Sequence, residues 1–186
     1  MTEQELIQGC RANRQEFQKA LFDLYAGKMM ALCNRYTSDR HLAQDMLQEG
    51  FIRVFKYIHQ FRKAMGSFEG WMRRIFASVA VRELKRNKVS FSDIDTAILT
   101  EPHVDPDVVS RMTEEEIHEL IRSMPVGYRT VFNLHVIEGY SHEEIAKIMN
   151  IQASTSRVQL MKAKQFMKAL IANIKKTNKA WATFLI

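Results

Sequence analysis

Apolar residues recur at intervals of three and four along most of this 186-residue chain, which is the spacing of a helix with one buried face. The chain has only seven Gly and three Pro, too few for a fold rich in tight turns. We therefore predict an all-α protein. In its first half, the spacing predicts helices over 3–36, broken near 11–14, then 39–60 and 68–87.

Residues 88–111 interrupt this pattern. They contain five Asp and Glu against two Lys and Arg, together with Pro102 and Pro106. Such a stretch is typical of a flexible acidic linker. We therefore expect two small helical domains joined by this linker. In the second domain the pattern predicts helices over 112–124, 127–137, 142–149 and 154–175.

The second domain contains the sequence form of a helix-turn-helix. Ser141 and Glu144 form a capping box, and Asn150 tolerates the left-handed backbone of a C-cap. Eight Lys and Arg, and no Asp or Glu, follow Glu144. The last helix could enter a DNA major groove, although an ordinary helical hairpin with a solvated basic face is the alternative. The side chains expected on bases and phosphates are Ser154, Thr155, Ser156, Arg157, Gln159, Lys162, Lys164 and Lys168.

A second candidate surface lies between residues 61 and 88, where aromatic residues alternate with cations. Aromatic rings stack on unpaired bases, and cations follow the strand that carries them. Aromatic residues buried beneath a basic face would give the same composition, so both interpretations stay open. The residues are Phe61, Arg62, Lys63, Phe68, Trp71, Arg73 and Arg74.

Asp45, Gln48 and Glu49 lie close together on the helix over 39–60, with the two carboxylates four residues apart on one face. A solvated face is the default interpretation, and a protein contact is the alternative. We expect no metal site on this face.

The sequence offers little support for catalysis. His142-Glu143 begins like the zinc motif HExxH, but Ala146 stands where the second His would be needed. We expect neither enzymatic activity nor a cofactor. Cys10 and Cys33 are expected to be reduced and buried. The start of the chain lacks the apolar core of a signal peptide, and no apolar run approaches the roughly 20 residues of a membrane span, so we expect a cytoplasmic protein.

The chain resembles a known family over residues 20–87 and 112–172. The family is the extracytoplasmic-function (ECF) sigma factors, a subfamily of the sigma-70 RNA polymerase factors. Their region 2 is similar to the segment ALFDLYAGKMMALCNRYTSDRHLAQDMLQEGFIRVFKYIHQFRKAMGSFEGWMRRI. Region 4 of the same family is similar to MPVGYRTVFNLHVIEGYSHEEIAKIMNIQASTSRVQLMKAK. The resemblance implies a region 2-like domain over 1–88, a linker over 89–111 and a region 4-like domain over 112–175. The apolar tail over 176–186 lies outside the family pattern.

This resemblance also implies a function and partners. Such a protein joins core RNA polymerase, directs it to promoters, and is often held inactive by an anti-sigma protein. Region 4 would read the −35 duplex and touch the polymerase β flap. Region 2 would dock on the β′ clamp helices through Asp45, Gln48, Glu49 and Phe51. It would hold the single-stranded −10 element through Phe61, Arg62, Lys63, Phe68, Trp71, Arg74 and Ser78.

Several positions depart from the family pattern. A Gly is usual where Ser154 stands, and a Ser is usual at Gln152 and Val158. Because of these departures, the family pattern does not predict which promoter sequence the chain recognises. They also keep open the alternative that the chain is a partner-binding scaffold that no longer recognises promoters. A stand-alone helix-turn-helix regulator is the other alternative. The apolar end of the tail is expected to pack on a domain or on a neighbouring chain through Trp181, Phe184, Leu185 and Ile186.

Overall fold

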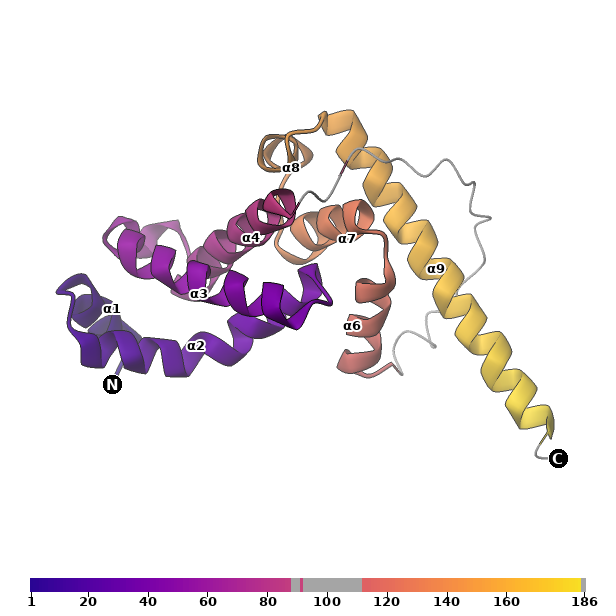
Figure 1. Cartoon of the computed structure of the whole chain (residues 1–186), viewed down its shortest axis with the longest axis horizontal. Coiled ribbons are helices and arrows are strands. Elements are labelled where there is room, and N and C mark those ends of the chain that lie inside the picture. Colours follow the sequence, from indigo (N-terminus) through magenta and orange to yellow (C-terminus); the bar gives the residue numbers. More distant parts are fainter. Residues whose placement is uncertain (88–90, 92–111, 185–186) are drawn as a thin grey trace. The chain divides into compact units, whose positions relative to one another are not determined.

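The computed structural model describes residues 1–87, 91 and 112–184. The chain divides into two compact units, Met1–Val89 (unit 1) and Ser90–Ile186 (unit 2). Helices and turns, without a strand, make up the described part of both units (Figure 1). The predicted all-α fold is confirmed. The predicted linker over 89–111 lies outside the described residues, apart from Phe91.

Side-chain caps mark the start of three of the four α-helices in unit 1, and the helix that begins at Gln15 has none. Thr2 and Glu5 form a capping box, and the side chains of Asp39 and Ser67 accept hydrogen bonds from backbone amides of the next turn. The predicted break of the first helix is confirmed, and Asn13 lies inside it with a φ of 55°. The helices are α1 (Glu3–Arg11), α2 (Gln15–Tyr36), α3 (Arg40–Tyr57) and α4 (Phe68–Arg86), with short 3₁₀ turns η1 (Ile58–Gln60) and η2 (Lys63–Met65) between the last two.

The core of unit 1 lies where α2, α3 and α4 pack against one another. Phe76 on α4 is fully buried and meets Phe51 of α3 edge-on, with ring centroids 5.3 Å apart. This approach requires Gly50, because a Cβ added there would overlap the Phe76 ring. Cys10 and Cys33 are free and buried as predicted, and burial raises the pKa of the Cys33 thiol to about 12.

Unit 2 contains the predicted helices, with two differences. The helix predicted over 127–137 ends in a π-helical turn. The last helix was predicted to end near 175, but it continues to Phe184, since no Gly or Pro follows Gly139 to stop it. The elements are α6 (Glu114–Ser123), α7 (Val126–Phe132), η3 (Asn133–Ile137), α8 (His142–Met149) and α9 (Ala153–Phe184).

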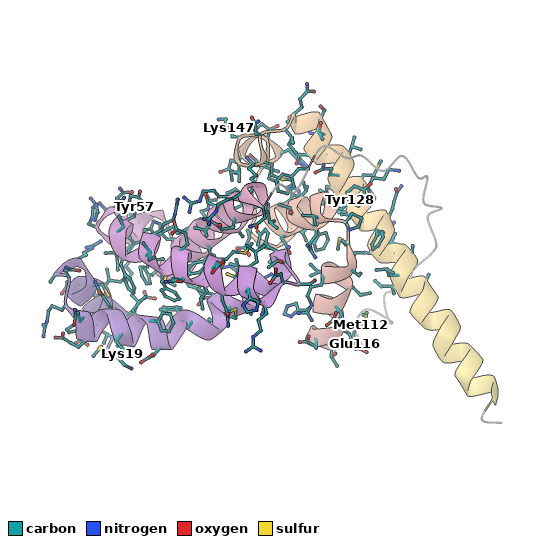
Figure 2. All side chains as sticks on the ribbon, in the orientation of Figure 1. Lys19, Tyr57, Met112, Glu116, Tyr128 and Lys147 are labelled. Carbon is teal, nitrogen blue, oxygen red and sulfur yellow. The ribbon has the colours of Figure 1, made fainter. Side chains whose placement is uncertain are left out.

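The core of unit 2 joins α6 and α7 to the middle of α9. Tyr128, labelled on α7 in Figure 2, packs with Ile121, Met124 and Ala163. Ala163 is fully buried, and its small side chain suits a position where helices pack closely. The proposed packing of the apolar tail falls on side chains outside the described residues. No helix within the described residues is long and apolar enough to cross a membrane.

Candidate functional site

The helix-turn-helix of α8 and α9 forms as the sequence predicts. The Ser141 hydroxyl accepts a hydrogen bond from the Glu144 amide, while the Glu144 carboxylate accepts one from the Ser141 amide. Asn150 ends α8 in the left-handed conformation, with a φ of 57°. Ile145 and Met149 bury the inner face of α8, and α8 packs against α9. These contacts fix which face of α9 remains available to a ligand.

Exposed side chains recur at intervals of three and four along α9 and so share one face of the helix. Three of them are cations, which suits contact with phosphates. The sequence interpretation missed Met161, which is 49% exposed, because a methionine at helical spacing is usually part of a core. We call this set the α9 stripe: Ser154, Arg157, Met161, Lys164 and Lys168.

Two residues predicted to face DNA are buried instead. The Ser156 hydroxyl lies 2.9 Å from Nδ1 of His142, and the Gln159 amide nitrogen donates to the carbonyl oxygen of Phe91. Both side chains are completely buried, because they share the inward face of α9 with Ala163. The prediction that Ser156 and Gln159 project from the helix is therefore wrong. Thr155 and Lys162 are half-buried at the margin of the α9 stripe.

Arg157 in the α9 stripe forms an ion pair within the unit. Its Nη2 lies 2.7 Å from Oε1 of Glu143 on α8, and both side chains are more than half exposed. Exposed pairs of this kind contribute only about 0–1 kcal/mol. Arg157 can therefore exchange Glu143 for another anion at little cost.

His135 and His142 stack beside the helix-turn-helix, with ring centroids 4.4 Å apart and planes inclined by 15°. Nδ1 of His135 lies 2.8 Å from the carbonyl oxygen of Tyr140. Burial lowers the pKa of His142, and the positive charges of His135, Arg157 and Lys164 lower it further, against an opposing effect of Glu143. The stack therefore favours neutral His142.

Acidification is expected to destabilise unit 2 through His142. Its pKa is lowered in the fold, so below the ordinary value the unfolded chain binds a proton that the folded unit does not. Stability is therefore full above about pH 6.5 and falls as the pH decreases toward the folded pKa. The pH dependence of the stability of unit 2 can be measured by thermal unfolding, with hydrogen exchange in unit 2 as the readout. H142Q should flatten the pH dependence, whereas H41Q, at an exposed position on α3, should leave it unchanged.

The aromatic residues of the second candidate surface form one cluster in unit 1. The ring centroids of Phe61, Phe68 and Trp71 lie 5.2–5.7 Å apart. Phe61 and Phe68 are buried, so the expectation that they stack on bases is not supported in this conformation; they complete the core between the loop and α4. Trp71 is half-buried. The exposed residues of the predicted set are Arg62, Lys63, Arg74 and Ser78.

The structure places Asp45, Gln48 and Glu49 of α3 around a hollow of about 210 Å³, which Glu83 and Arg86 of α4 also line. Glu49 Oε1 accepts hydrogen bonds from Arg53 at 2.8 Å and from Arg82 at 2.6 Å. Asp45 and Gln48 are exposed.

Two hydrophobic residues of this acidic surface differ from the sequence prediction in their exposure. Phe51 is buried, contrary to its predicted role in docking, because its ring packs on Phe76. Ile52, which sequence reasoning missed, lines the hollow and is 53% exposed. Among the described residues, no three His, Cys, Asp or Glu side chains gather to hold a metal ion.

Both units are similar to known protein families. The family models "Sigma-70 region 2" and "Sigma-70, region 4" match residues 21–89 and 114–167. The RNA polymerase sigma-H factor of Pseudomonas aeruginosa is 30% identical over 181 residues, which cover 89% of this chain and 93% of that protein. The chain belongs to the sigma-70 family of RNA polymerase sigma factors.

Within this family, the sigma factor is of the ECF type. The ECF factor SigW of Bacillus subtilis is 26% identical over 166 residues, or 83% of this chain and 88% of that protein. A solved structure of the sigma factor RpoE of Bartonella quintana, in complex with the anti-sigma factor NepR, has the same fold. It superposes with a TM-score of 0.51 at 15% identity and covers 83% of this chain and 96% of that one.

Proposed function

We propose that this sigma factor directs core RNA polymerase to promoters, with unit 2 reading the −35 duplex through the α9 stripe. The observation that supports this most directly is the register of α9. Arg157, Lys164 and Lys168 are exposed on one face, while Ser156 and Gln159 face inward. A recognition helix reads bases near its N-terminus and meets phosphates further along, and the order of these side chains fits that arrangement.

Unit 1 would hold the single-stranded −10 element. Arg62 and Lys63 offer cations on the loop between α3 and α4, while Arg74 and Ser78 are exposed on α4. Trp71, half-buried, is the ring of the aromatic cluster most available to stack on a base. The buried Phe61 and Phe68 would support this surface from below.

Core polymerase would dock at the hollow on α3. An exposed apolar side chain, Ile52, lines this hollow together with the polar Asp45 and Gln48, and protein contacts combine apolar and polar side chains in this way. An anti-sigma protein is a further proposed partner, since one binds the Bartonella sigma factor of the same fold. A protein that works with core polymerase would act in the cytoplasm.

Reversing the charge of Asp45 tests the docking surface. D45R is expected to weaken binding to core polymerase about tenfold, because a favourable charge contact becomes a repulsive one. D23R is the matched control, since Asp23 is an exposed aspartate on α2. Titration of labelled sigma factor with core, followed by run-off transcription, gives both readouts. Equal effects of the two variants would contradict docking at α3, and failure of the unaltered chain to bind core would contradict the proposed function.

A further inference from the structure

Helix α1 lies outside the matched region 2, yet it is tied to the loop that follows α3. Arg11, the last residue of α1, donates from Nη2 to the carbonyl oxygen of Phe61 at 2.7 Å. Its Nε also donates to the carbonyl oxygen of Ile58, at 3.4 Å. These carbonyls lie at the end of the helical run of α3 and η1, where the helix dipole favours a cation. The Ile58 carbonyl also accepts a hydrogen bond from the Phe61 amide, at 3.2 Å. The planar guanidinium is suited to hold both carbonyls at once.

The Phe61 carbonyl oxygen is shared by two guanidinium groups. Arg62 donates from Nη1 to the same oxygen at 3.2 Å and to the carbonyl oxygen of His59 at 2.6 Å. Arg11 and Arg62 therefore meet at one acceptor. A displacement of the Phe61 carbonyl would also displace the side chain of Arg62, which belongs to the surface proposed for the −10 strand.

Helix α1 is itself a fixed support. Leu6, Ile7 and Cys10 are buried, and the Tyr25 hydroxyl of α2 donates to Glu3 at 3.1 Å. The packing between α1 and the loop is open, however. A cavity of about 600 Å³ is lined by Ile7, Arg11 and Arg62 among others. Hydrogen bonds from Arg11 therefore hold the loop in a place where side chains do not fill the space.

We propose that Arg11 is a positioning residue for promoter-strand capture. By fixing the Phe61 carbonyl, it holds Arg62 and the adjacent Lys63 in the conformation that receives the single-stranded −10 segment. The proposal rests on the proposed function of this loop. It assigns a role in promoter opening to a helix that lies outside the matched region.

The test uses the full chain bound to core polymerase, with duplex promoter DNA for the rate of opening and with forked promoter DNA, single-stranded at −10, for strand capture and base preference. R11A is expected to lower the rate of open-complex formation roughly tenfold, the effect of one charge-assisted hydrogen bond, and to weaken base preference at −10. R11K keeps the charge but loses the planar fork, so its rate should be intermediate. R14A is the matched control, because Arg14 is exposed and pairs with Glu16. Binding to core and to the −35 duplex should be unchanged in all three variants.

Two outcomes would overturn the proposal. R11A could open promoters at the unaltered rate, or it could lose core binding, thermal stability and strand capture together, which would mark a purely structural role. The variant R62A distinguishes a failure of the positioning role of Arg11 from a failure of the proposed function of the loop. If R62A impairs strand capture and R11A does not, only the positioning role is wrong. If R62A and K63A both leave strand capture unchanged, the loop does not bind the −10 segment and both proposals fail.

Discussion

Truncation of Phe76 to alanine is expected to lower the free energy of unfolding of unit 1 by about 3–5 kcal/mol, the usual cost of removing a buried aromatic ring. The Phe76 side chain has no exposed surface, and its ring packs against Phe51 and against the backbone at Gly50. Its loss leaves a cavity where α3 and α4 meet. Hydrogen exchange on the full chain should show lower protection in α2, α3 and α4, with α7 to α9 unchanged.

Two further variants test whether the site or the substitution causes this loss. L24A removes a side chain that is 57% exposed on α2, and its effect should stay within about 0.5 kcal/mol. G50A adds a methyl group where the Phe76 ring already lies, so it should destabilise unit 1 by about 1–3 kcal/mol. If F76A costs no more than L24A, the core is not where the structure places it.

Helix starts could be predicted from the sequence because the side-chain caps that set them are local, whereas the end of α9 was missed because no such signal marks it. Ser141 caps α8 through Glu144, three residues away, and Ser67 caps α4 through the amide of Gly70. Contacts between residues far apart in the chain leave no local pattern in the sequence from which they could be predicted. Arg11 and Phe61 are 50 positions apart, and nothing in either segment indicates that a guanidinium from one meets a carbonyl of the other.

The candidate site could be predicted only in part, because exposure depends on helix register. The sequence interpretation took a run of neighbouring residues at the start of α9 as facing DNA, but the burial of Ala163 turns Ser156 and Gln159 inward. Similarly, the alternation of aromatic residues and cations near Phe61 fits either a stacking surface or a core. Only the packing of Phe61 on Phe68 decides that both rings are buried, with Trp71 at the margin.

Substitution of Arg157 by alanine is expected to cost roughly 1–3 kcal/mol of binding at a specific −35 duplex if the side chain contacts a base. Arg157 is exposed near the start of α9, where a recognition helix meets base edges, and its guanidinium can pair with two acceptors of a guanine. Affinity of the holoenzyme for promoter fragments that differ only in the −35 element measures the loss. R157K is the matched variant, since it keeps the charge and loses the bidentate geometry.

Glu143 competes with DNA for Arg157, so its removal should change duplex binding in the opposite direction to R157A. In the free protein it holds Arg157 at 2.7 Å, so DNA must displace it. E143Q removes the competing carboxylate and a negative charge beside the α9 stripe, and should strengthen duplex binding by up to about 1 kcal/mol. In the R157A background the same change should gain less, because the pair is already broken. If R157A weakens binding equally on every sequence, Arg157 contacts phosphate alone, and base reading at −35 must come from other residues of the α9 stripe.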